Sequence, residues 1–326
     1  IFDALNKIGK VIRGNERAFG GIQVIFSGDF YQLPPVGKKE VDACRFCFES
    51  VEWNNVFDKQ IQLIKIYRQT DETYASILNQ IREGKIKKRS HEMLTERVGR
   101  KKEKESELII TKMYPTKHMV ESVNNSSMSM LEGEEREYQL KSSKNLEMSK
   151  NDRIKREDYS EKDIMTELDY MASNILCEKS IKLKVGAHVM CVVNIQSDNG
   201  LLEVCNGSQG KITRFCEITG CPIVKFNNGK EMTMTMNTWK SERIPGVGVK
   251  QVPLILAWAI TIHKSQGATM DAAEIDIGSD IFECGQTYVA LSRIKSILGL
   301  YLTSYDVSKI KINKKVKEFY EKLMTY

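Results

Sequence analysis

Two apolar runs, each followed at once by a polar segment, constrain the fold of this chain more than any other feature. Residues 22–26 (IQVIF) precede the segment 27–36 (SGDFYQLPPV), and residues 254–262 (LILAWAITI) precede 263–267 (HKSQG). Short apolar runs of this kind are typical of buried parallel strands. Ligands of open α/β sheets bind beyond the carboxyl ends of the strands. The sequence therefore predicts an α/β fold with functional residues in the two polar segments.

Helical periodicity accompanies these predicted strands. Phe2, Leu5, Ile8 and Ile12 recur at helical spacing, so residues 1–13 are expected to form an amphipathic helix. The same criteria predict further elements, namely helices at 74–81, 286–294 and 316–323 and strands at 108–111 and 300–302. This order implies two parallel-sheet domains, of which the first is only partly present.

A change to short strands marks an inserted unit at about 195–250. Four strand-like runs are separated by Gly and Asn: 189–193, 211–215, 223–226 and 231–236. Residues 227–230 (NNGK) are a hairpin turn signal, so we expect a small antiparallel barrel. The methionines of the last run alternate with polar residues. They are expected to form one packed face of a strand rather than a ligand set.

Two charged stretches are interpreted as exposed. Residues 82–105 carry ten basic and five acidic side chains, and a solvated helix face is favoured over a binding patch. Residues 132–163 carry ten acidic and eight basic side chains with almost no apolar periodicity. We therefore expect a long exposed insertion there, partly disordered.

Composition excludes several classes of protein. The chain has 326 residues, 41% of them hydrophobic, which is enough for two packed cores. It has no run of roughly 18 apolar residues, and its first residues lack a basic region followed by an apolar one. We therefore expect neither a membrane protein nor a secreted one. The net charge of +6 suits nucleic acid without proving that it is bound.

The cysteines are interpreted as scattered thiols of a cytosolic protein. There are eight of them: 44, 47, 177, 191, 205, 216, 221 and 284. Cys44 and Cys47 form one CxxC, but no second CxxC or His pair accompanies it. Ordinary thiols are therefore favoured over a zinc site, and no metal ligand is assigned.

Three side chains are candidates for phosphate chemistry. Gln32 offers a donor and an acceptor on a loop that adjacent prolines make rigid, although the same residues also suit a structural turn. Arg68 lies between a strand-like segment and a helix, and Arg293 lies on the polar side of an apolar helix. Arginine suits bidentate contact with a phosphoryl group, but a structural ion pair is the alternative for each.

The polar segment after the second apolar run is a candidate ligand loop. His263, Lys264 and Ser265 supply an imidazole, a cation and a hydroxyl, respectively. Gly267 allows the backbone to approach a ligand closely. A lone histidine is more often structural, but the density of polar groups here favours a binding role.

No phosphate-binding P-loop is present in the sequence. Each of five Gly-Lys pairs lacks the Ser or Thr that a P-loop places next. The only Asp-Glu pair, Asp71-Glu72, does not end an apolar strand, so it is a poor magnesium site. The chain therefore has no nucleotide-binding motif of this kind of its own.

Four ordered segments resemble the motifs of one family of motor proteins. Residues 28–36 are similar to motif III of the petite-integration-frequency (PIF) DNA helicases of superfamily one, relatives of the RecD helicases. Residues 67–69 (YRQ) resemble motif IV, 257–269 resemble motif V, and 285–293 resemble motif VI. Weaker similarity extends this resemblance over nearly the whole chain apart from about 130–180.

The resemblance implies an α/β fold of tandem RecA-like P-loop NTPase domains, the first one truncated, with an inserted Src-homology-three-like antiparallel β-barrel. The domain ranges implied are 1–60 for the C-terminal part of the first RecA-like domain and 195–250 for the barrel. The second RecA-like domain consists of two segments, 61–194 and 251–326, and the first of these contains a charged insertion at about 130–180. It also implies an ATP-dependent motor that moves 5′ to 3′ on single-stranded DNA and separates duplexes. ATP and Mg²⁺ are the implied cofactors, and single-stranded and forked DNA the implied partners. DNA repair, recombination and telomere maintenance are the implied processes, and a monomer is the default.

Site residues follow from the resemblance by position. Gln32 would couple the state of the γ-phosphate to the DNA track, while Arg68 and Arg293 would act as arginine fingers. Gly267 would lie at the nucleotide. The side chains of 263–265 would face the DNA or the cleft between domains.

The family's motifs I and II, which hold the phosphates and magnesium, are absent. Residues 1–5 resemble the helix that follows motif II, and the first residue is not Met. The chain is therefore expected to be a fragment that lacks the first half of the first RecA-like domain and does not hydrolyse ATP alone. The alternatives are a non-catalytic or split DNA-binding remnant that needs a separate ATP-binding half, and an ATPase that binds DNA without unwinding it.

Overall fold

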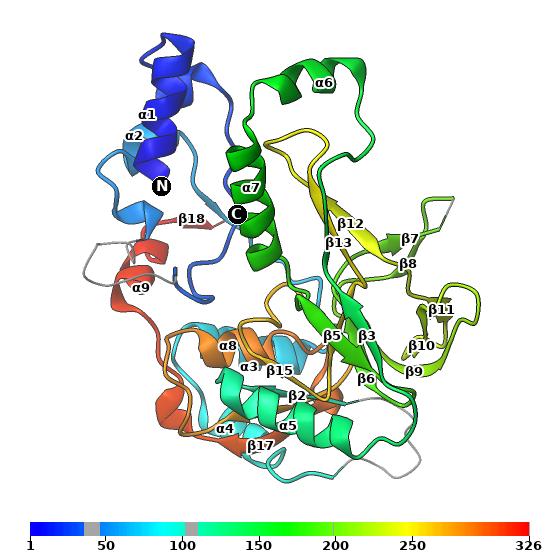
Figure 1. Cartoon of the computed structure of the whole chain (residues 1–326). Helices are drawn as coiled ribbons and strands as arrows, with labels where there is room; N and C mark the ends of the chain where they lie inside the picture. Colours follow the sequence, from blue (N-terminus) through cyan, green and yellow to red (C-terminus); the bar gives the residue numbers. More distant parts are fainter. Residues whose placement is uncertain (36–45, 102–109, 198, 326) are drawn as a thin grey trace. The chain divides into compact units, whose positions relative to one another are not determined.

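The computed structural model describes residues 1–35, 46–101, 110–197 and 199–325 (Figure 1). The chain divides into two compact units. Unit 1 comprises Ile1–Gly99, Ile277–Ile297 and Leu302–Tyr326, and unit 2 comprises Arg100–Asp276 and Leu298–Tyr301. The four domain ranges expected from the sequence do not coincide with these units and remain a prediction.

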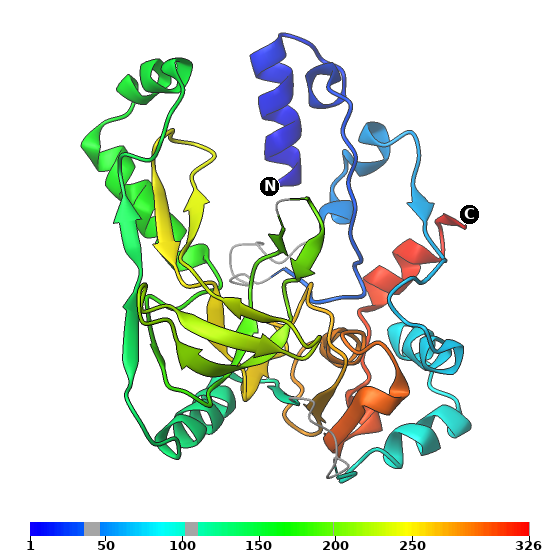
Figure 2. The ribbon, with the colours of Figure 1, turned by 90° about the vertical axis from the view of Figure 1, so that its right-hand side faces the viewer.

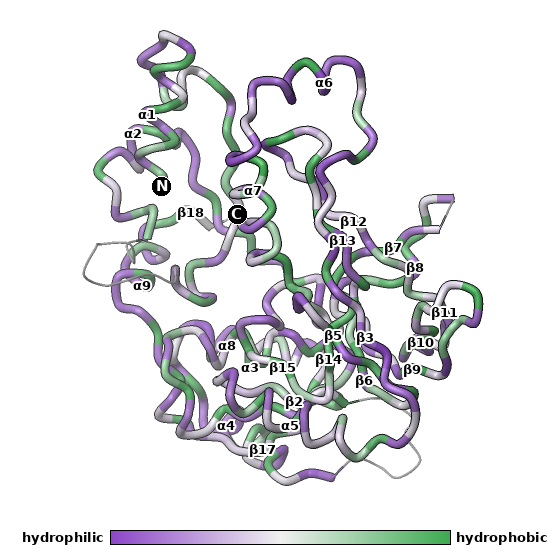
Figure 3. Tube along the Cα trace, viewed as in Figure 1, coloured by the Kyte–Doolittle hydropathy of each residue, from purple (hydrophilic) through white to green (hydrophobic). Residues whose placement is uncertain are grey.

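Unit 1 is mainly helical. Its helices are α1 (Phe2–Arg13), α2 (Trp53–Val56), α3 (Glu72–Arg82), α4 (Lys88–Thr95), α8 (Gln286–Leu291) and α9 (Lys314–Tyr320). The short strands β1 (Ile61–Gln62) and β18 (Met324–Thr325) pair in parallel. Helix α1 confirms the prediction for 1–13 and ends at Gly14, whose left-handed backbone glycine adopts without strain. Hydrophobic and hydrophilic positions alternate along it in Figure 3.

The strand predicted at 22–26 is absent from the structure. These residues form no strand, and Ile25 is 86% exposed. A strand exists only where a neighbour supplies hydrogen bonds, and no described strand pairs with this segment. The prediction of a strand at 22–26 is therefore wrong for the described residues: the segment has the composition of a strand, but it pairs with no strand there.

An aromatic cluster joins the last helix of the chain to its first sixty residues. The ring of Phe319, from α9, stacks on Phe48 at 4.4 Å and meets Phe30 edge-on at 5.4 Å. Trp53 and Phe2 extend the cluster. Helix α9, red in Figure 1, therefore packs within unit 1 beside the segment that carries Gln32.

A parallel sheet lies at the start of the candidate ligand loop. Its strand order is β15 (Ala259–Thr261), β2 (Thr111–Tyr114), β16 (Ala273–Ile277) and β17 (Leu300–Tyr305). Strand β2 pairs in parallel with β15 and β16. Helix α5 (Lys117–Ser129) is tied to β15, since Asn124 exchanges hydrogen bonds of 2.9 and 3.0 Å with the backbone of Ala259. The strand predicted at 108–111 lies largely outside the described residues, and β2 begins at its end.

A five-stranded antiparallel sheet forms the main core of unit 2 (Figure 2). Its order is β11 (Glu231–Thr233), β10 (Pro222–Phe226), β9 (Gln209–Phe215), β6 (His188–Cys191) and β14 (Leu254–Leu256). The run 254–262, expected as one strand, is split at 257–258 between this sheet and the parallel one. The antiparallel sheet thus extends beyond the expected range 195–250.

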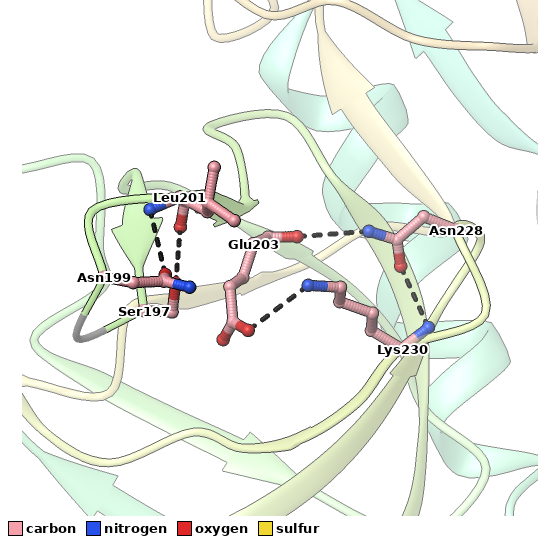
Figure 4. Close-up of polar contacts among 6 residues, drawn as sticks. All are labelled: Ser197, Asn199, Leu201, Glu203, Asn228 and Lys230. Atoms are coloured by element: carbon pink, nitrogen blue, oxygen red, sulfur yellow. Dashed lines mark hydrogen bonds and ion pairs between the residues drawn. The ribbon is translucent and has the colours of Figure 1, made fainter.

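Two hairpins of unit 2 are tied together by polar side chains (Figure 4). Strands β7 (Ile195–Gln196) and β8 (Leu202–Val204) form one of them. Lys230, in the turn between β10 and β11, lies 3.2 Å from a carboxylate oxygen of Glu203, and Asn228 Nδ2 donates to the Glu203 carbonyl at 3.1 Å. The expected hairpin turn at 227–230 is confirmed.

The stretch 132–163 is exposed, as expected, since none of its residues is buried, but it contains regular secondary structure where partial disorder was expected. It contains β3 (Arg136–Gln139), β4 (Lys141–Ser143), α6 (Lys150–Glu157) and the start of α7 (Glu161–Asn174). β3 pairs with β5 (Ser180–Leu183), and β4 pairs with β13 (Gly248–Gln251), which also pairs with β12 (Asn237–Lys240). Ser149 and Ser160 cap α6 and α7 with capping boxes. The buried residues that fix α7, Ile164 and Leu168, lie just past the charged window, so its apolar periodicity was missed.

Met234 provides a test of the methionine face. It is 1% exposed within the core of the antiparallel sheet, so we expect Met234→Ala to lower the free energy of unfolding by about 2–5 kcal/mol. Met130 is 78% exposed, and Met130→Ala is expected to cost less than about 0.5 kcal/mol. Chemical denaturation of both variants checks this. Similar losses in the two would contradict the packed face.

Candidate functional site

Two arginines that are far apart in the sequence, Arg68 and Arg293, lie at the C-terminal end of α8. The last carbonyls of an α-helix have no intrahelical donor. Arg293 Nε donates to the carbonyl of Val289 at 2.9 Å, and Arg293 Nη2 donates to Ser292 Oγ at 2.7 Å. Arg68 Nη1 donates to the carbonyl of Ser292 at 3.3 Å. The predicted pair, Arg68 and Arg293, therefore meets at one helix end.

Two further side chains hold the same segment against α8. Gln69 Nε2 donates to the carbonyls of Ser292 and Ile294 at 3.2 and 3.1 Å. Tyr74 is fully buried, and its hydroxyl donates to the carbonyl of Leu291 at 2.8 Å. Burial raises the pKa of Tyr74, so this hydroxyl stays a donor at neutral pH. The position of Arg68 is thus fixed by its neighbours.

The two guanidinium groups lie within electrostatic range of each other. Arg293 is 2% exposed. Burial and then the positive charge of Arg68 lower the pKa of Arg293 to about 10, while Tyr288 and Asp29 act in the opposite direction. Arg293 therefore remains charged at neutral pH. The partial negative charge of a helix C-terminus favours such cations. The two guanidinium groups together suit an anion with several negative charges, such as a phosphate chain.

Gln32 lies in a turn at the other end of α8. Its N–H donates to the carbonyl of Asp29 at 3.1 Å, which closes the turn. Gly285, the residue before α8, has φ 77°, and a Cβ there would come within 2.6 Å of the Gln32 carbonyl oxygen. This contact requires glycine. One short helix therefore has Gln32 at its start and the two arginines at its end.

Asp29 and Arg82 belong to the same site and were missed by the sequence analysis. Arg82 forms a two-pronged ion pair with Asp29, with Nη2 to Oδ1 at 3.0 Å and Nε to Oδ2 at 3.3 Å. Arg82 had been placed in a charged run expected to be solvated. Arg82 directly follows the last buried apolar residue of α3, Ile81, and this position next to the apolar face could have indicated that Arg82 is partly buried.

The candidate ligand loop 263–267 lies in unit 2, directly after β15. Gly267 has φ 87° with open space around the position of a Cβ, so its backbone conformation is what requires glycine there. The following residue, Ala268, packs against Gly207, where a Cβ would come within 2.8 Å of the Ala268 Cβ. This contact fixes the end of the loop against the turn before β9.

Within this loop the three polar side chains have different surroundings. His263 and Lys264 are half-buried, while Ser265 is fully buried. Ser265 Oγ donates to the carbonyl of Ile262 at 2.7 Å, and the Lys264 N–H donates to Thr261 Oγ1 at 3.1 Å. Ser265 thus shapes the loop in this structure, and its contact with DNA stays a prediction, as do those of His263 and Lys264.

No metal centre was found in the part of the chain that the structure describes. There, no three or more His, Cys, Asp or Glu side chains are grouped to hold an ion. Cys47 is a free thiol, whereas Cys44 lies outside the described residues. Likewise, no helix in the described ranges is long and apolar enough to cross a membrane.

Comparison with known proteins decides the family. Residues 1–92 match the PIF1-like helicase family, and 168–215 match the 2B domain of DNA helicase Pif1. The crystal structure of the Pif1 helicase from Candida albicans is 31% identical with a TM-score of 0.72, covering 98% of this chain and 73% of that one. This chain belongs to the PIF1-like helicase family.

Other PIF1-like helicases agree with this assignment. The ATP-dependent DNA helicase PIF1 of Danio rerio is 34% identical over 99% of this chain and 47% of its own length. Pif1 from Bacteroides bound to single-stranded DNA is 28% identical with a TM-score of 0.63, covering 98% of this chain and 71% of that one. The chain thus spans about half the length of the curated PIF1 relatives it matches. Its mixed α/β fold, with parallel and antiparallel sheets among the described residues, matches the Pif1 structures.

Proposed function

We propose that the intact protein is an ATP-dependent DNA helicase that moves 5′ to 3′ on single-stranded DNA and separates duplex DNA, with this chain as one portion of it. The arrangement around α8 carries the proposal. It brings Arg68 and Arg293 together at one end of a helix whose other end contacts the turn of Gln32. Two cations at one end of the helix, and an amide side chain on a turn held at the other end, suit a triphosphate. The family membership supports the same activity.

Each residue has a role that its contacts allow. ATP supplies the phosphoanhydride bond whose cleavage releases free energy. Arg68 and Arg293 neutralise negative charge on the transferring phosphoryl group, and their bonds to α8 keep both guanidinium groups in place. Gln32 senses whether a phosphate is present, because its side chain can both donate and accept. Gly267 approaches the nucleotide with its backbone, and His263, Lys264 and Ser265 contact the DNA.

The domain organisation proposed for the intact protein is a pair of RecA-like domains with an inserted barrel. The parallel pairing of β2 with β15 and β16 is consistent with the second RecA-like domain, and the antiparallel strands β9, β10 and β11 are consistent with the insert. We assign 1–60 to the first RecA-like domain, 61–194 and 251–326 to the second, and 195–250 to the inserted barrel.

A further part of the intact protein is proposed to supply the P-loop and the magnesium-binding Asp-Glu motif. Neither motif occurs in this sequence, and the described residues do not group as a metal site. Ile25, Leu63 and Ile64 are 61–86% exposed in unit 1. Such apolar side chains offer a surface for that part to cover. Mg²⁺ would be held there rather than by this chain.

Strand displacement tests the proposal. The intact protein is expected to hydrolyse ATP in the presence of single-stranded DNA and to displace a strand from a duplex with a 5′ tail but not from one with a 3′ tail. ATP turnover without displacement on either substrate would favour an ATPase that binds DNA without unwinding it. Neither turnover nor displacement would favour the non-catalytic or split remnant.

Lys264 provides a test of the DNA-binding loop in this chain alone. Affinity for single-stranded DNA is expected to fall linearly with salt on a double-logarithmic plot, with a slope of about −0.7 for each phosphate that is neutralised. If Lys264 contacts one phosphate, Lys264→Gln should make the slope shallower by about 0.7. Lys162, exposed on α7, provides the matched control in Lys162→Gln. Fluorescence anisotropy measures both, and equal slopes in the two variants would remove Lys264 from the DNA site.

A further inference from the structure

The turn that carries Gln32 is fixed through the side chain of Asp29. Asp29 Oδ1 accepts the N–H of Tyr31 at 3.1 Å, and the Asp29 carbonyl accepts the N–H of Gln32 at 3.1 Å. An aspartate that binds its own backbone two residues on is a common way to stabilise a turn. Whatever fixes the carboxylate of Asp29 therefore also fixes the backbone of Gln32.

The last helix of the chain supplies one of the groups that fix Asp29. Tyr320, at the end of α9, donates its hydroxyl to Asp29 Oδ1 at 3.2 Å and accepts the N–H of Phe30 at 3.1 Å. Burial, and then the negative charge of Asp29, raise the pKa of Tyr320 to about 12. The hydroxyl is therefore protonated at neutral pH and acts as a donor. One side chain thus binds two consecutive residues of the turn, from 290 residues away in the sequence.

Arg82, at the end of α3, is a second group that fixes Asp29, and Tyr288 of α8 also interacts with this carboxylate. Its ion pair with Asp29 leaves the guanidinium 4.4 Å from the ring centre of Tyr31 and 4.8 Å from that of Tyr320. The two rings stack on each other with centres 4.7 Å apart. Burial alone would lower the pKa of Arg82, but the hydrogen bond and charge of Asp29 outweigh it and raise the pKa. The group therefore stays charged and joined to both rings.

We propose that Tyr320 and Arg82 are positioning residues for Gln32, and that the C-terminal helix α9 thereby sets the rate of ATP turnover. The proposal rests on the proposed function, because Gln32 is assigned to the nucleotide there. Neither residue needs to touch the nucleotide. They hold Asp29, Asp29 holds the turn, and the turn presents Gln32. A displacement of about 1 Å in such a group can lower a rate by about 100-fold.

Tyr320→Phe in the intact protein is the sharpest test. This change removes the hydroxyl and its two hydrogen bonds but keeps the ring, so the stacking on Tyr31 is retained. We expect kcat for DNA-stimulated ATP hydrolysis to fall about 10- to 100-fold, with KM for ATP and affinity for single-stranded DNA within about twofold of the original. A general loss of folded protein would lower the active fraction and the DNA-binding capacity together, which this pattern distinguishes.

Tyr305→Phe is the matched control within unit 1. The Tyr305 hydroxyl also bonds a side chain, His91 Nδ1 at 3.1 Å, but it does not contact the turn. We expect kcat of this variant to stay within about twofold. An equal fall of kcat in Tyr305→Phe and Tyr320→Phe would overturn the proposal, and so would an unchanged kcat in Tyr320→Phe.

Hydrogen exchange in this 326-residue chain separates the proposal from the proposed function. It needs no ATP, so it remains informative if the intact protein proves not to hydrolyse ATP. Tyr320→Phe is expected to speed exchange of the Phe30 amide at least about tenfold, since that N–H loses its acceptor, and to speed exchange at Gln32 in the same direction. Tyr305→Phe should leave both amides unchanged.

Arg82→Gln provides a second variant for the same measurements. It keeps a long side chain but removes the charge and the two-pronged contact, and it should speed exchange at Gln32 and lower kcat in the same direction as Tyr320→Phe. Unchanged exchange at Gln32 in both variants would overturn the positioning role, because the turn would then be fixed by other groups. Faster exchange with an unchanged kcat in an active enzyme would equally overturn it.

Discussion

Arg293→Ala in the intact protein is expected to lower ATP turnover by about 10³-fold or more while leaving the affinity for single-stranded DNA largely in place. Arg293 is 2% exposed at the end of α8, where the charge of Arg68 already contributes to lowering its pKa. The expected loss follows from the proposal that Arg68 and Arg293 neutralise charge on the same phosphoryl group. Steady-state ATP hydrolysis at saturating DNA measures the effect.

Two variants control for the burial of Arg293. Arg293→Lys keeps a positive charge but loses the planar fork, and its turnover is expected to stay well below that of the original protein. Arg89, exposed on α4, provides a matched loss of charge in unit 1, and Arg89→Ala should leave turnover unchanged. Near-normal turnover in Arg293→Ala would remove this residue from the site and leave it as a cap of α8.

Gly285→Ala is expected to lower both the stability of the chain and the turnover of the intact protein. The φ of 77° at this position costs an alanine about 1–2 kcal/mol. In addition, the new Cβ would meet the backbone carbonyl oxygens of Tyr31 and Gln32, at 2.6 Å for the latter, which adds about 1–3 kcal/mol of overpacking. Relief requires the turn to move away from α8. We therefore expect a combined loss of about 2–5 kcal/mol in the free energy of unfolding, together with a severe loss of turnover in the intact protein.

Gly14→Ala measures the cost of a positive φ by itself, without a steric overlap of the new Cβ. Gly14 follows α1 with φ 55°, and nothing lies within 4 Å of the position of a Cβ. This variant should lose only about 1–2 kcal/mol, with normal turnover. Denaturant unfolding of both variants gives the difference, which measures the contact between Gly285 and the turn. Equal losses in the two would show that the turn does not rest on α8.

The sequence predicted the secondary structure best where the apolar periodicity of a segment is enough to define the element. Helices α1, α3, α8 and α9 and strands β6, β9, β10 and β11 occur where apolar spacing placed them. The segment 22–26 failed as a strand because strand formation depends on a neighbour, which no local pattern reveals. The run 254–262 failed as a single strand for a related reason, since its two halves pair with different sheets.

The candidate site was predictable only in part. Gln32, Arg68 and Arg293 were proposed from residue chemistry and from the resemblance, and the structure places them around one helix. The contributions of Asp29, Arg82 and Tyr320 could not be predicted, because their partners are up to 291 residues apart. In the sequence, Arg82 belongs to a charged run and Tyr320 to an apolar helix face. Only the folded chain brings an acid, a guanidinium and a phenol to one point.

The return of α9 to the first sixty residues has a consequence for the order of events during synthesis. Phe30 and Tyr320 are joined across 290 positions, so the aromatic cluster of unit 1 cannot be completed until α9 has been synthesised. At about 5–20 residues per second, this takes roughly 15–60 s after the early segment has been made. Phe2, Trp53 and Phe57 can pack on one another during that interval, but Phe30 and Phe48 lack the ring of Phe319 until α9 arrives.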